Sequence, residues 1–190
     1  LLIFYVSRMA YYLFMFIAIP VFFEIDIVLS VWLCLVPEHT VLFVRLILIL
    51  TLVEILSRML ITAQSATGRI RNYQLVVGGL LMLNFPISYL VLKLGYPPES
   101  TVIVGIFVSF ICLVARLCFL RSMVSLHVRD FVYQVLLNVF VVTLLSSVIP
   151  AVCYYFIDHQ VIRFFAVCIS SVVMSIVVIY FVGCNQSERQ

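Results

Sequence analysis

Six long runs of apolar residues constrain this chain more than any other feature of its sequence. They cover roughly residues 3–23, 40–63, 73–93, 100–121, 132–156 and 161–183. Each run is about 20 residues or slightly longer, the length that a helix needs to cross the hydrocarbon core of a bilayer. The period-two alternation of a transmembrane β-barrel is absent from the sequence. We therefore predict an all-α integral membrane protein with six transmembrane helices.

The composition agrees with a protein embedded in a lipid bilayer. Of the 190 residues, 66% are hydrophobic and 10% are charged, whereas a soluble domain needs a surface rich in charge. The formal net charge of +3 is small and dispersed, which argues against a nucleic-acid partner. The six cysteines form no CxxC pair and no mixed Cys/His cluster. This pattern favours packing residues in helices over disulfides or metal ligands, and we expect no metal and no cofactor.

Basic residues near the ends of the runs predict the orientation, because they concentrate on the cytoplasmic side of a membrane. One side carries Arg8, Arg69, Arg71, Arg121, Arg129 and Arg189. The other side carries Lys93, Arg163, Glu24, Asp26, Glu38, Glu99 and Asp158. We place the arginine-rich side in the cytoplasm. Both termini are then cytoplasmic, and the number of crossings is even.

The second run holds ionisable residues well inside the membrane, where they are costly and by default mark a functional site. At 100° per residue, its polar positions share an arc of roughly 80° on one helix face. These positions are Thr51, Glu54, Arg58, Thr62 and Ser65. Glu54 precedes Arg58 by four residues, the better order for an ion pair within a helix. The stripe either pairs with itself in a packed bundle or lines a pathway for substrate or ions, and both interpretations stay open.

Two further runs carry weaker polar signals. One face of the fourth run presents Thr101, Gly105, Ser109, Cys112 and Arg116. Small residues at this spacing are typical of close helix packing, and Arg116 lies near the cytoplasmic end. In the third run Asn84 lies beside Pro86, which we expect to kink the helix. Asn84 and Arg116 join the stripe as candidate pathway residues, and no residue is predicted to be catalytic.

Four stretches resemble one family of bacterial membrane transporters. They are LVPEHT at 35–40, AQSATGRIRNYQ at 63–74, FPISY at 85–89 and LKLGYPPES at 92–100. In order and spacing they resemble the polysaccharide exporters, the O-antigen and capsule-type flippases of the multidrug/oligosaccharidyl-lipid/polysaccharide superfamily. The resemblance covers about residues 1–130, whereas the last two runs fit by position and hydropathy only.

The resemblance implies a fold, a function and a location. Members of this family have two six-helix bundles around a central cavity, often with two extra helices at the end. Residues 1–130 would then form four transmembrane helices of the second bundle, and residues 131–190 two additional C-terminal helices. The N-terminal half of the polypeptide would be missing, which agrees with a chain that begins at Leu1 rather than Met. The implied function is to flip an undecaprenyl-diphosphate-linked oligosaccharide from the inner to the outer leaflet of the bacterial inner membrane by alternating access.

The polar stripe suggests roles within such a transporter, although the resemblance itself assigns none to these positions. Arg58 would attract a diphosphate or an acidic sugar. Glu54 would hold Arg58 in place or bind a coupling proton or cation. These roles are hypotheses that rest on the charge of the two side chains and on their depth in the membrane.

Other functions stay open at the level of sequence. A drug exporter or another lipid exporter of the same superfamily would use the same architecture. A non-transporting scaffold subunit would tolerate apolar residues at Glu54 and Arg58. An intramembrane enzyme is disfavoured, because Val53 stands where one membrane-protease motif has a second glutamate and no apolar run contains a histidine. We therefore predict a transporter rather than an enzyme.

Overall fold

The computed structural model describes residues 2–33, 35–66, 68, 71–124 and 128–183. Within these ranges the chain forms helices joined by short turns, and no β-strand occurs. The helices are α1 (Leu2–Phe23), α2 (Ile25–Leu33), α3 (Thr40–Ser65), α4 (Arg71–Met82), α5 (Asn84–Lys93), α6 (Ser100–Val124), α7 (Val128–Phe131), α8 (Asn138–Phe156) and α9 (Gln160–Val178). Two short π-helices, η1 (Val132–Leu137) and η2 (Ile179–Gly183), precede α8 and follow α9.

Six helical segments among the described residues are long and apolar enough to cross a membrane. They are Ile3–Phe23, Thr40–Ser65, Arg71–Lys93, Ser100–Arg121, Arg129–Phe156 and Gln160–Gly183. The prediction of an all-α protein with six membrane-spanning helices is confirmed. The boundaries lie within a few residues of the apolar runs, because the polar and proline-containing turns between the runs end each helix.

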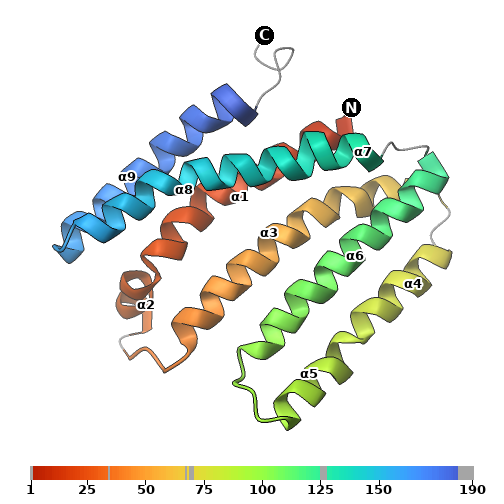
Figure 1. Ribbon diagram of the computed structural model, residues 1–190, viewed down its shortest axis with the longest axis horizontal. Coiled ribbons are helices and arrows are strands. Elements are labelled where there is room, and N and C mark those ends of the chain that lie inside the picture. The colour runs from red at the N-terminus through yellow and green to blue at the C-terminus, as the bar shows by residue number, and fades with distance from the viewer. Residues whose placement is uncertain (1, 34, 67, 69–70, 125–127, 184–190) are drawn as a thin grey trace.

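The spans lie roughly in a row, with α1 near its middle (Figure 1). The hairpin of α8 and α9 packs on one side of α1, and α3 packs on its other side. Beyond α3 come α6 and then α4 and α5. A core of buried apolar residues joins α1, α3, α6 and the segment from α7 to α8, and it includes Tyr12, Met15, Leu60, Leu113 and Phe131. Because successive spans alternate in direction, α3 and α6 run parallel to each other.

The third span is interrupted near its middle. The helix stops at Met82 and resumes at Asn84, with a turn at Leu83. Pro86 has no backbone N–H, so the carbonyl oxygen of Met82, four residues earlier, loses its usual donor. The interruption lies at this point in the chain, which agrees with the expected effect of Pro86.

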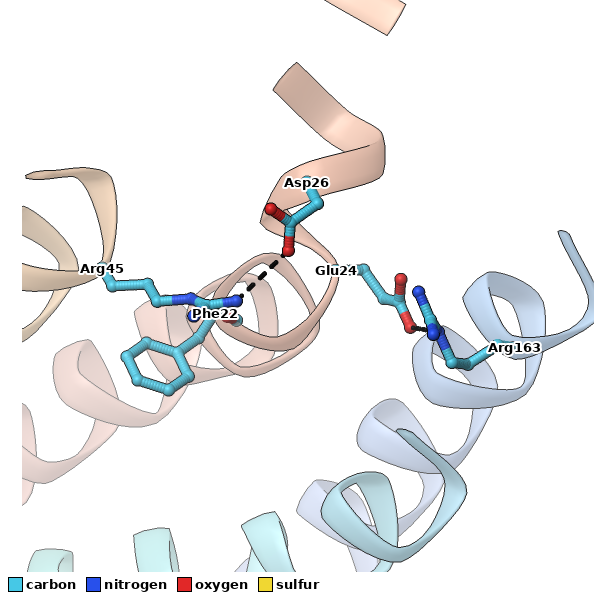
Figure 2. A network of polar contacts seen from close by, with 5 residues as sticks. All are labelled: Phe22, Glu24, Asp26, Arg45 and Arg163. Atoms are coloured by element: carbon cyan, nitrogen blue, oxygen red, sulfur yellow. Dashed lines mark hydrogen bonds and ion pairs between the residues drawn. The ribbon is translucent and has the colours of Figure 1, made fainter. Parts of the chain in front are cut away.

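Two ion pairs tie the end of α1 to its neighbours (Figure 2). Glu24, at the bend between α1 and α2, accepts a hydrogen bond of 2.9 Å from Nε of Arg163 on α9. On the other side, Arg45 of α3 donates from Nε to the Phe22 carbonyl at 3.2 Å and from Nη2 to Asp26 at 3.3 Å. Both arginines also lie over aromatic rings, Arg45 over Phe22 and Arg163 over a tyrosine of α8. The expected surface charges at this end therefore serve as links between spans.

The N-terminal half of α1 is joined to the C-terminal hairpin by polar contacts. The Tyr12 hydroxyl donates to Oδ1 of Asn138 at 3.0 Å, and Nδ2 of Asn138 donates to the Val182 carbonyl at 3.4 Å. Arg8 donates to the Gly183 carbonyl at 3.4 Å. Gly183 lies against Tyr12, and a Cβ atom at this position would meet the tyrosine ring at 3.0–3.2 Å. A side chain at position 183 would therefore require the Tyr12 ring to shift by a few tenths of an ångström.

Candidate functional site

Three ionisable side chains lie at similar depth in two neighbouring parallel spans. With a rise of about 1.5 Å per residue, Glu54 lies about 21 Å and Arg58 about 27 Å from the start of α3. On α6, Arg116 lies about 24 Å from the start of that helix. Both helices are about 38 Å long by the same rise, so all three positions lie inside the helices, more than about 10 Å from either end.

The structure brings these three side chains to one cavity between α3 and α6. Glu54, Arg58 and Arg116 line this polar cavity, which has a volume of about 250 Å³. The other residues that line it are Ser57, Ile61, Leu81, Ser109 and Cys112. Arginines from two spans thus converge on a space with hydroxyl groups in its wall, which is an arrangement suited to an anionic group.

The ion pair within α3 is loose. Nη2 of Arg58 is 3.8 Å from Oε2 of Glu54, and the side chains are 67% and 47% exposed, respectively. At that separation the pair has electrostatic attraction without a hydrogen bond of ordinary length. The open ion pair leaves most of the N–H donors of Arg58 available to a ligand. Pairing within α3 therefore does not use the full hydrogen-bonding capacity of Arg58.

Arg116 is the buried charge of the site. Arg116 is only 9% exposed. Its Nε has no hydrogen-bond partner among the described residues. A buried guanidinium needs compensating charge or hydrogen bonds, because removing it from water is expensive. The lining has two arginines and one glutamate, so the cavity carries an excess of one positive charge when all three are ionised. A bound anion would offset this cost.

The other members of the predicted stripe do not line the cavity. The hydroxyls of Thr51, Thr62 and Ser65 donate to carbonyl oxygens one turn earlier in α3, at 2.8, 3.2 and 2.9 Å. Hydroxyls in membrane helices are commonly satisfied in this way. Asn84 also lies outside the cavity. It accepts a hydrogen bond of 3.4 Å from Ser88 and lies next to Gly105 of α6.

Sequence reasoning missed part of the lining. Ser109 and Cys112 share with Arg116 the face of α6 that the sequence assigned to close packing, and in the structure this face also borders the cavity. Ser57 follows Glu54 by three residues, so its position on the same side of α3 was available as a signal. Leu81 comes from α4, and nothing in its sequence context distinguishes it from its apolar neighbours.

Part of the sequence motif after α3 lies outside the described residues. This applies to Thr67, Arg69 and Ile70, and also to the basic residue Arg189 near the C-terminus. Arg71 is described and begins α4 with an exposed side chain. No group of three or more His, Cys, Asp or Glu side chains suited to a metal occurs in the described part of the chain.

No family model, no curated protein and no solved structure matches this chain.

Proposed function

We propose that this protein is part of a transporter that flips an undecaprenyl-diphosphate-linked oligosaccharide from the inner to the outer leaflet of a bacterial inner membrane. The observation that carries the proposal is the convergence of Arg58 and Arg116 on one polar cavity well inside two membrane-spanning helices. The four sequence stretches that resemble polysaccharide flippases support the same function. Both termini are cytoplasmic in this proposal.

The physical argument concerns the diphosphate group. A diphosphate and its glycan cannot cross hydrocarbon unaided, because each charged or unsatisfied polar group costs several kcal/mol there. Arg58 has free N–H donors at the cavity, and buried Arg116 supplies positive charge that no acid on α6 offsets. Guanidinium groups bind phosphate oxygens in pairs of parallel hydrogen bonds. Glu54 limits the affinity by competing for Arg58, which favours release on the other side.

The open side of the site is also part of the proposal. Arg58 and Glu54 are exposed at a depth where lipid would otherwise surround them. We propose that upstream helices of the same polypeptide supply the facing wall of the pathway. Alternating access would then move the two walls relative to each other around the bound diphosphate.

Export of surface polysaccharide tests the proposal directly. Arg58→Gln and Arg116→Gln, made in the transporter expressed in its own cell, should each lower export about tenfold to a hundredfold, because each removes charged hydrogen bonds to phosphate. Arg121→Gln is the matched control. It removes an exposed arginine from the same helix α6 outside the cavity. If Arg58→Gln and Arg116→Gln export as much polysaccharide as Arg121→Gln, at equal protein levels in the membrane, the proposed role of the cavity is excluded.

A further inference from the structure

A second cavity, almost wholly apolar, lies between α1, α3 and α8. Its volume is about 250 Å³, and we call it the apolar groove. Residues of α1 form its base, and Met15, Ala18 and Ile19 among them are buried. Leu48, Ile49 and Leu52 of α3 and Thr143 and Ser147 of α8 form its walls. Ile49 is exposed, so the groove opens on the surface of the bundle.

The two hydroxyl groups in the groove do not make it polar. Thr143 donates to the Val139 carbonyl at 2.7 Å, and Ser147 donates to the Thr143 carbonyl at 2.7 Å. Each hydroxyl therefore already donates a hydrogen bond within α8 and does not need a ligand as its acceptor. A cavity with apolar walls stays dry, so only hydrocarbon fills this groove favourably.

The groove follows α1 from Met15 to Phe23, which is about 12 Å along the helix axis. Because its walls are apolar over this length, the groove suits a hydrocarbon chain of the surrounding lipid.

A cation and an anion lie at the end of the groove where α2 begins. Arg45 is one helical turn from Leu48 and Ile49, and its guanidinium contacts the Phe22 ring that lines the groove. The Arg45 guanidinium bonds Asp26, which lies just beyond the end of the first span at Phe23. The guanidinium therefore lies near the ends of the membrane-spanning helices, where lipid headgroups are found.

The pair at this end has hydrogen-bonding capacity left for both halves of a zwitterionic headgroup. Arg45 uses one donor on the Phe22 carbonyl and one on Asp26, and a guanidinium has five. Asp26 is half exposed and accepts the hydrogen bond from Arg45 through Oδ2. A carboxylate can accept further hydrogen bonds. The remaining donors of Arg45 suit a phosphate, and the free oxygen of Asp26 suits a primary ammonium.

We propose that the apolar groove binds one acyl chain of a bilayer phospholipid whose headgroup carries a primary ammonium, such as phosphatidylethanolamine. The phosphate accepts hydrogen bonds from Arg45, and the ammonium donates to Asp26. Phosphatidylcholine fits the groove equally well but has no N–H to donate to Asp26. The site is separate from the polar cavity and does not depend on the transported substrate.

Native mass spectrometry of the purified chain, titrated with dioleoyl phosphatidylethanolamine or dioleoyl phosphatidylcholine, tests this site. The wild-type protein should retain one phosphatidylethanolamine molecule with about twofold to fivefold higher affinity than phosphatidylcholine, the range for a partly exposed charge pair. Asp26→Asn should abolish this preference while keeping binding of both lipids. Asp158→Asn is the control, since it removes an exposed carboxylate from the turn between α8 and α9.

Filling the groove tests the acyl-chain part of the proposal. Ala18→Phe and Ile49→Trp should each abolish retention of both lipids, whereas Ile17→Phe and Ile47→Trp, at exposed positions outside the groove on the same two helices, should not. Ile49 lies at the opening of the groove, where a larger side chain disturbs the core less. Lipid retention by Ile49→Trp therefore decides the test if Ala18→Phe does not fold. Equal wild-type affinity for the two lipids, or retention by Ile49→Trp equal to that of Ile47→Trp, would overturn the proposal.

Discussion

Loss of Arg163 should destabilise the fold more than loss of its partner Glu24. Arg163 is 21% exposed at its side chain and lies 4.7 Å from the Tyr154 ring, whereas the Glu24 side chain is 1% exposed. Arg163→Leu therefore leaves a carboxylate buried without its cation. Glu24→Gln leaves an arginine that keeps its aromatic contact and reaches the surface. Loss of Arg163 and loss of Glu24 therefore differ in how much they lower the stability of the fold.

The distance sets the scale of the effect. Coulomb's law at 2.9 Å, with an effective dielectric constant of about 20, gives an attraction of about 6 kcal/mol. Most of this only offsets the cost of burying the two ions, so the pair as a whole contributes little net stability. Removal of one partner leaves the other ion buried without an opposite charge, so the cost of burying it is no longer offset. We expect Arg163→Leu to lower the free energy of unfolding by about 3–5 kcal/mol, and Glu24→Gln to lower it by about 1.5 kcal/mol, the worth of a charged hydrogen bond.

Unfolding of the purified protein in mixed micelles, followed by the fluorescence of Trp32 on α2, measures both effects. Trp32 is the single tryptophan of the chain and belongs to the helix that begins next to Glu24. Arg129→Leu, at an exposed arginine, is the control for loss of a cation. The double variant Glu24→Gln with Arg163→Leu decides the reasoning. It should be more stable than Arg163→Leu alone, because a neutral amide costs less to bury than a carboxylate. A double variant less stable than Arg163→Leu would refute burial of the carboxylate as the source of the effect.

Two further predictions concern the packing of α1 and the limits of the polar cavity. Gly183→Ala should lower the free energy of unfolding by about 1–3 kcal/mol, because the new methyl group meets the Tyr12 ring. Gly79→Ala should raise the free energy of unfolding by about 0.5–1 kcal/mol, because Gly79 has open space around it. Chemical unfolding in micelles compares the two variants. For the proposed transporter, Thr51→Val should leave export unchanged, since the Thr51 hydroxyl is bonded within its own helix, whereas Ser57→Leu should lower export by filling the cavity. Reduced export from Thr51→Val, or normal export from Ser57→Leu, would contradict the assignment of these two residues.

The membrane spans could be predicted from sequence because the bilayer acts on local composition. A helix satisfies its own backbone hydrogen bonds, so about 20 apolar residues between polar turns suffice to define a span. The kink near Pro86 could be predicted for the same reason, since a missing N–H acts within one turn. The partners of charged side chains could not be predicted in this way. Arg45, for example, donates hydrogen bonds to Phe22 on α1 and to Asp26 on α2.

The candidate site, like the fold, could be predicted only in part from sequence. The i, i+4 spacing of Glu54 and Arg58 predicted a shared helix face, because neighbours on one helix follow from its period. By itself the sequence therefore determined the helices, their boundaries and the polar face of α3. Only the tertiary structure decided that Arg116 of α6 meets this face at one cavity while Thr51 and Asn84 do not. The physical reason is that contacts between helices depend on which spans become neighbours and how they are rotated, and packing over the whole bundle decides both.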